Sequence, residues 1–160
     1  MQCMTSEECN QWRENYLLKA SWKYQITCHT PLKRLPLFTQ LLLEQLQPVN
    51  AALIIIDQIV FDVPEGLTGM RRAASEQRRV REAPGHLFEN ENEGLKAMLE
   101  TVYSGWTDFR LLVTPPHHAL LADHDEYTTF FSASREKIAQ LHETLKGLQI
   151  PVVRYRAKAP

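Results

Sequence analysis

The sequence predicts one domain of the α+β or α/β class, in which helices pack on a single mixed β-sheet. Three observations predict this class. Apolar residues recur at helical spacing over residues 35–46, alternate with polar ones over residues 22–29, and form an uninterrupted run over residues 51–56. These patterns are typical of an amphipathic helix, of a half-buried strand and of a strand covered on both faces, respectively.

The first half of the chain is expected to begin with a helix for which Ser6 is a suitable N-cap, because Glu7 and Glu8 follow near its positive end. A strand over residues 22–28 and a helix over residues 35–46 follow. Residues 51–63 are expected to form a central strand that anchors the sheet.

Residues 64–92 are polar and rich in arginine, and they predict a segment that covers the core. A short helix is expected over residues 68–78. The sequence Ala83-Pro84-Gly85 then favours a break in regular structure.

The second half predicts a helix around residues 95–102, which starts near Asn92 and stops at Gly105. Strands over residues 106–114 and 120–131 come next, the second beginning either at residue 120 or only near residue 126. Ser132 or Ser134 caps a last helix, and residues 150–155 form a closing strand. The predicted order is α-β-α-β-(α)-α-β-β-α-β.

Length and composition predict one globular domain over residues 1–160, since 44% of the residues are apolar and 23% are charged. The chain has 18 lysines and arginines against 19 acidic residues. This balance gives no overall field toward nucleic acid or anionic membranes, so any such contact must be local.

The N-terminus has no basic stretch followed by an apolar run, which argues against a secretory signal. The apolar run over residues 51–56 is far shorter than the roughly 20 residues that cross a bilayer. Cys3, Cys9 and Cys28 lack C-x-x-C spacing, so free thiols are expected rather than a zinc or redox site. Together these features favour a cytoplasmic protein.

Asp123, His124 and Asp125, with His117 and His118 just upstream, form the densest group of reactive side chains. Imidazole and carboxylate groups bind divalent metals, and a histidine beside a carboxylate can act as an acid or base. In an extended backbone, however, neighbouring side chains point to opposite faces, so the sequence predicts that this group diverges and holds no metal. The alternative interpretation is turn chemistry, in which the aspartates bind nearby backbone groups.

No complete catalytic or cofactor motif occurs in the chain, and no cofactor is expected. Cys28 and His29 would point to opposite faces of a strand, and Gly-x-Ser-x-Gly is absent. The run that ends at Asp57 resembles the magnesium-binding strand of phosphate-loop NTPases, but the phosphate loop itself is missing.

Five arginines cluster in the covering segment: Arg71, Arg72, Arg78, Arg79 and Arg81. On a helix Arg71 and Arg78 would share one side, and Glu76 would lie four residues from Arg72. A solvated face is the favoured interpretation, because acids are interspersed and no aromatic residue is available to stack bases. A ridge that contacts nucleic acid is the alternative.

The segment Glu82-Ala-Pro-Gly-His-Leu-Phe-Glu89 is expected to hold His86 near the entrance of a helix. Together with the Trp106-x-x-x-x-Leu111-Leu112 strand and His124-Asp125-Glu126, it resembles uncharacterised bacterial proteins of similar length. The resemblance covers the second half of the chain and implies no activity.

The leading hypothesis is a non-enzymatic cytoplasmic binding module with a protein partner, of which immunity or inhibitor proteins of bacterial toxins are one example. A small hydrolase, using a metal or acid/base chemistry at residues 117–126, and a nucleic-acid binder using residues 71–81 are the alternatives. The sequence does not indicate an oligomeric state. The candidate binding residues are His86, Glu89, His117, His118, Asp123, His124, Asp125, Arg71, Arg72, Arg78 and Arg79.

Overall fold

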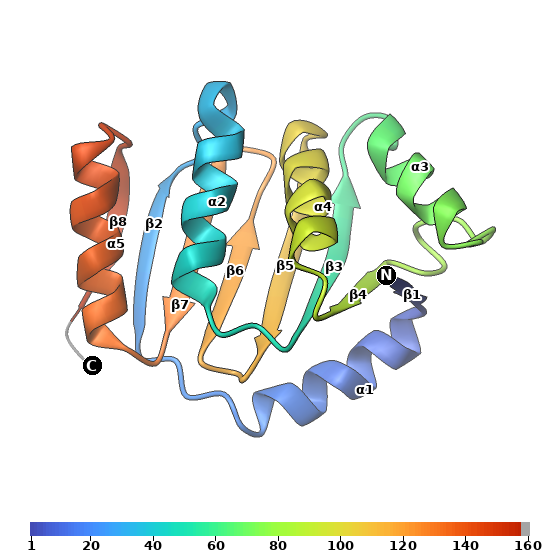
Figure 1. Cartoon of the computed structure of the whole chain (residues 1–160), viewed down its shortest axis with the longest axis horizontal. Helices are drawn as coiled ribbons and strands as arrows, with labels where there is room; N and C mark the ends of the chain where they lie inside the picture. The colour runs from blue at the N-terminus through green and yellow to red at the C-terminus, as the bar shows by residue number, and fades with distance from the viewer. Residues whose placement is uncertain (158–160) are drawn as a thin grey trace.

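The structure is a computed structural model that describes residues 1–157 as one eight-stranded sheet with five α-helices (Figure 1). The predicted class is confirmed in its α+β form, and each pairing of neighbouring strands in the described chain is antiparallel. In sheet order the strands are β1 (Gln2–Met4), β4 (Gly85–Glu89), β3 (Ala51–Ile59), β5 (Thr107–Thr114), β6 (His118–Ala122), β7 (Tyr127–Ser132), β2 (Tyr24–His29) and β8 (Val152–Arg156).

Four of the five α-helices begin and end close to their predicted limits, whereas the short helix expected over residues 68–78 lies at Glu65–Ala73. The helices are α1 (Ser6–Leu17), the 3₁₀ turn η1 (Leu32–Arg34), α2 (Leu35–Leu46), α3 (Glu65–Ala73), α4 (Asn92–Ser104) and α5 (Arg135–Gly147). The cap of α1 is Thr5 rather than Ser6, because Thr5 Oγ1 accepts from the Glu8 amide and Glu8 Oε2 accepts from the Thr5 amide. Ser134 caps α5 by accepting from the Lys137 amide. No helix of residues 1–157 has the length and apolar character needed to cross a bilayer.

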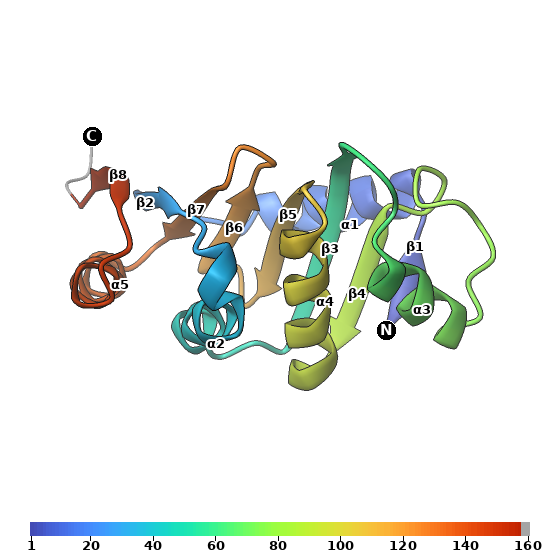
Figure 2. The same ribbon diagram turned by 90° about the horizontal axis from the view of Figure 1, so that it is seen from above.

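The two faces of the sheet carry separate apolar cores. Helices α2, α3, α4 and α5 lie on one face and α1 on the other, as Figure 2 shows from above. The larger core joins side chains such as Phe38, Phe109 and Phe130, while the smaller one packs Cys9 and Tyr16 of α1 on Leu53. Because both faces are covered at the middle, β3 is apolar on both sides over residues 52–56. The predicted central position of this strand is therefore correct.

Two predicted segments differ from the structure. The segment over residues 64–92 is more than a cover, since it contains α3 and then β4, a strand of the sheet in which residues 85–88 are buried. His86 therefore lies within a strand and not at a helix entrance. The predicted strand over residues 120–131 is two strands, β6 and β7, joined by a turn at residues 123–126. The short edge strand β1 was not predicted, because three residues carry too little periodicity to read.

Candidate binding sites along one edge of the sheet

The predicted histidine and aspartate group is divided between the two ends of β6. His117 and His118 lie at the start of this five-residue strand, and Asp123 and His124 follow its end. At about 3.4 Å per residue, the strand holds the two halves too far apart to act on one substrate. Among residues 1–157 no three histidine, cysteine or acidic side chains are placed to hold a metal ion.

His118 is buried on the face of the sheet that α2, α3, α4 and α5 cover, with its ring centroid 5.5 Å from that of Phe130. Burial, assisted by the charges of Lys137 and His117, lowers the pKa of His118 to about 4. The imidazole is therefore neutral near pH 7 and belongs to the core. Glu89 is also remote from the β6–β7 turn. It is the last residue of β4 and pairs with Ala51, the first residue of β3, at the opposite ends of the strands.

Residues 123–126 form a turn between β6 and β7, so the expected extended backbone at these residues is wrong. The Asp123 amide donates to the Tyr127 carbonyl at 3.1 Å, and the Tyr127 amide donates to Asp123 Oδ1 at 3.0 Å. Glu126 adopts a left-handed φ of 65°. Asp123 thus performs the turn chemistry that the sequence offered as an alternative.

His124 pairs with Asp108, which sequence reasoning did not single out. The His124 amide and its Nδ1 lie 2.6 and 2.8 Å from Asp108 Oδ1, and its Nε2 lies 3.8 Å from Asp125. The hydrogen bond to Asp108 and the nearby carboxylate charges raise the pKa of His124. No hydroxyl or thiol within residues 1–157 is hydrogen-bonded to His124, so the pair has an acid/base group and no positioned nucleophile.

Beside this turn lies a group of exposed apolar side chains. Phe61 is 71% exposed and Trp106 is 43% exposed, and their rings meet edge to face with centroids 6.1 Å apart. Val63, 45% exposed, follows in the same connection between β3 and α3. Trp106 has a left-handed φ of 51°, and its carbonyl accepts from the Val60 amide at 3.4 Å.

Carboxylates belong to the same surface. Trp106 lines a small depression together with Asp123 and Glu126, Asp62 follows Phe61 in the chain, and the Asp125 side chain in the β6–β7 turn is 75% exposed. We call this surface the aromatic edge. Its members are Phe61, Asp62, Val63, Trp106, Asp123, Asp125 and Glu126.

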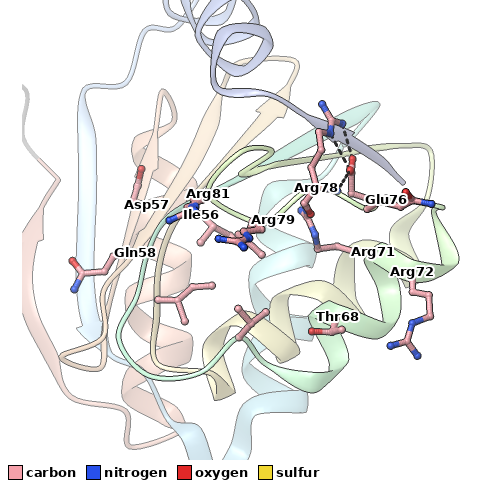
Figure 3. A pocket seen from close by; sticks show the side chains of 14 residues that line it. Ile56, Asp57, Gln58, Thr68, Arg71, Arg72, Glu76, Arg78, Arg79 and Arg81 are labelled. Carbon is pink, nitrogen blue, oxygen red and sulfur yellow. Dashed lines mark hydrogen bonds and ion pairs between the residues drawn. The ribbon is translucent and has the colours of Figure 1, made fainter.

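A second feature, the arginine-lined cleft, lies next to Val63. The cleft has a volume of about 850 Å³ and is bounded by the end of β3, by α3 and by the loop that leads to β4 (Figure 3). It is lined by Ile56, Asp57, Gln58, Ile59, Val63, Thr68, Arg71, Arg72, Glu76, Gln77, Arg78, Arg79, Val80 and Arg81. Arg81 was not among the predicted binding residues.

The arginines do not form the predicted helical ridge. Helix α3 ends at Ala73, and Ser75 turns the chain with a φ of 57°, so Arg78 and Arg79 lie in the loop. Glu76 pairs with Arg78 at 2.6 Å and not with Arg72. This pairing holds the pKa of Glu76 at about 2, and Arg78 also donates to the Cys3 carbonyl of β1.

Arg71 is buried beneath the loop and fastens it to the sheet. Its Nη1 donates to the Ala83 carbonyl and to His86 Nε2, both at 2.8 Å, and its Nη2 donates to the Arg78 carbonyl at 2.9 Å. Burial and the Arg71 charge lower the pKa of His86 to about 4. His86 is therefore a neutral acceptor that supports the cleft from below rather than a group that meets a ligand.

The structure thus brings Arg71, Arg72, Arg78 and Arg79 to one cleft, and Asp123, His124 and Asp125 to one turn, while His117, His118 and Glu89 lie elsewhere. Phe61 and Trp106 were assigned to strands on their apolar character, and no local pattern distinguishes an exposed aromatic residue from a buried one.

Comparison of the chain with protein families, with curated proteins and with solved structures found no match.

Proposed function

We propose that this protein is a non-enzymatic binding module that recognises another protein through the aromatic edge. The observation that carries the proposal is the contact between Phe61 and Trp106, two large aromatic side chains that are 71% and 43% exposed. Trp, Tyr and Phe are enriched at the centres of protein interfaces, where their burial supplies much of the binding energy.

The charges of this surface indicate the kind of partner. Asp123 and Glu126 line the depression beside Trp106, Asp125 belongs to the same turn, and Asp62 follows Phe61 in the chain. These carboxylates attract a basic protein surface and steer it into contact at a rate that falls with added salt. An aromatic face can also receive a lysine or arginine side chain. An immunity or inhibitor protein that covers a basic toxin in the bacterial cytoplasm is one example of this class.

A second candidate, a small acid/base hydrolase, is favoured only by the His124–Asp108 pair. Loss of a hydrolytic activity in His124→Gln, with that activity retained in Phe61→Ser, would support the hydrolase and displace the binding module.

Photo-crosslinking in the host cell tests the proposed surface. A benzoylphenylalanine at position 61 is compared with one at Leu18, which is 85% exposed after α1 and remote from the edge. We expect one protein to be captured from position 61 and not from position 18, through a segment of that protein that carries basic residues. Equal capture from both positions, or none from position 61, would contradict the proposal.

The affinity for the captured partner then shows whether Phe61 contributes to binding or only lies close to the partner. We expect Phe61→Ser to weaken binding by about 30-fold, the effect of losing a side chain worth about 2 kcal/mol at an interface centre. Leu18→Ser, a comparable change at another highly exposed apolar residue, should leave the affinity unchanged. Isothermal titration calorimetry measures both, and equal affinities of the two variants would refute a role for the aromatic edge.

A further inference from the structure

The arginine-lined cleft has an unbalanced charge. Its lining holds five arginines and two carboxylates, and both carboxylates already have partners. Glu76 pairs with Arg78, and Asp57 pairs with Arg110, which is outside the cleft. Within residues 1–157, Arg71, Arg72, Arg79 and Arg81 form no ion pair. Like charges gathered in a concave surface focus a positive potential that favours anions.

The cleft is also held in place before any ligand arrives. Arg71, 5% exposed, ties α3 to the loop through the Ala83 and Arg78 carbonyls. The loop is closed on itself by bonds from the Glu82 and Ala83 amides to the Arg79 carbonyl. A buried guanidinium without a carboxylate partner is costly, and a nearby anion would offset part of that cost. A loop whose backbone is already fixed loses little freedom on binding.

Arg79 and Arg81 are the residues positioned to receive the anion. Both line the cleft from the loop: Arg79 lies over it, and Arg81 lies beside Ile56 at its rim, where it also borders the neighbouring depression at Asp57 (Figure 3). Arg72 is part of the lining, but its side chain extends away from the centre of the cleft (Figure 3). The Arg79 backbone amide, and not its side chain, bonds to Glu82. The two guanidinium groups are therefore free to bind oxygen atoms, and a planar guanidinium matches phosphate geometry with two parallel hydrogen bonds.

The rest of the lining combines neutral polar side chains, Gln58, Thr68 and Gln77, with an apolar part. Ile59, Val63 and Val80 contribute aliphatic surface beside the arginines. A cavity of about 850 Å³ lies in the range of sites for small organic ligands, which are mostly apolar with a few placed polar groups. We propose that the cleft binds a small phosphate ester, with its phosphate on Arg79 and Arg81 and its organic part on the aliphatic surface.

The cleft is better suited to a small phosphate ester than to nucleic acid. None of the described residues that line it is aromatic, so no side chain there could stack on successive bases. The site shares Val63 with the aromatic edge, but the variants that test it change neither Phe61 nor Trp106. Failure of one proposal therefore leaves the other in place.

Calorimetric titration of the full chain with AMP, phenyl phosphate, pyrophosphate and uncharged adenosine tests the proposal. We expect at least one phosphate ester to bind, and adenosine to bind at least about 10-fold more weakly than AMP if AMP is that ester. The double variant Arg79→Ala/Arg81→Ala should weaken ester binding at least about 100-fold, because it removes two charge-assisted contacts. Arg154→Ala/Arg156→Ala removes two exposed arginines from the distant strand β8 and should bind as the wild type does.

Three results would overturn the proposal. One is no binding of either ester at ligand concentrations up to about 10 mM, which is weaker than the millimolar affinity of a marginal small-molecule site. The second is ester binding that survives Arg79→Ala/Arg81→Ala with an unchanged thermal unfolding curve. The third is binding of a hexaglutamate peptide in the absence of ester binding, which would make the cleft a site for an acidic polypeptide. If the double variant unfolds, Arg79→Lys/Arg81→Lys, which keeps charge and loses the paired geometry, replaces it.

Discussion

At the scale of single residues, Arg71 and His86 show how a polar pair is kept in the interior. Arginine can only donate, so His86 Nε2 accepts and the imidazole carries its proton on Nδ1. That Nδ1 has no hydrogen-bond partner within the described chain. The pair thus secures the cleft loop at the cost of one unsatisfied donor, and protonation of His86 would place two positive charges in contact.

This contact predicts a pH-dependent stability. The folded-state pKa of His86, about 4, lies below the ordinary histidine value of 6.5, so the unfolded chain binds the proton first as the pH falls. The contribution of His86 to the free energy of unfolding is fully present above pH 6.5 and is lost as the pH falls from 6.5 to 4. The loss amounts to on the order of 3 kcal/mol. Urea unfolding of wild type and His86→Gln at several pH values measures it.

The variant should lose less stability than the wild type between pH 6.5 and pH 4, because glutamine accepts from Arg71 without titrating. His118, also with a pKa of about 4, maintains part of the pH dependence in both proteins. Identical slopes for the two proteins would show that His86 does not carry the effect.

At the scale of elements, Gly85 explains how α1 reaches the sheet. The start of β4 lies between β1 and β3, and a side chain at position 85 would collide with Cys9 of α1 and come within 3.0 Å of Met4 Cβ. No described glycine has a positive φ, so Gly85 is needed for close approach and not for a turn. The break expected at Ala83-Pro84-Gly85 therefore ends before Gly85, which is the first residue of β4 and is required there by close packing.

Gly85→Ala should lower the free energy of unfolding by about 2 kcal/mol through overpacking. Cys9→Ala in the same chain removes the sulfur that the new methyl group meets. We expect the double variant to be more stable than the sum of the two single changes predicts, by about 1 kcal/mol. Chemical denaturation of the four proteins measures this coupling, and strict additivity would contradict the proposed contact.

Elements with strong periodicity could be predicted, and those defined by a distant partner could not. Helix α2 occupies the predicted residues, since its apolar stripe and Pro36 are local signals. Strand β4 has no such signal: Gly85 and His86 are poor strand formers, and they are extended because β1 and β3 pair with them. The same reason hid Asp108, whose partner His124 lies 16 residues away.

At the scale of the whole molecule, the sheet has a protected centre and two exposed edges. Strands β3 and β5 pair along most of their length and are covered on both faces at the middle, whereas β1 and β8 each have one neighbour. Val153 and Tyr155 of β8 are 57% and 43% exposed. Stability is therefore expected to fall from the centre of the sheet to its edges.

Native-state hydrogen exchange measures this gradient. We expect backbone amides of β3 and β5 to exchange about 100-fold or more slowly than those of β1 and β8, because edge strands open without global unfolding. Protection of β8 equal to that of β3 would mean that another surface covers this edge.

The sequence by itself determined the class of the fold, the central strand and most helix limits, because these depend on the periodicity of apolar residues along a few turns or strand residues. Only the tertiary structure decided which of the reactive residues meet: β6 separates His118 from His124, and the turn after α3 gathers the arginines around a cleft. Such meetings depend on pairing between residues far apart in the chain, which local patterns do not encode.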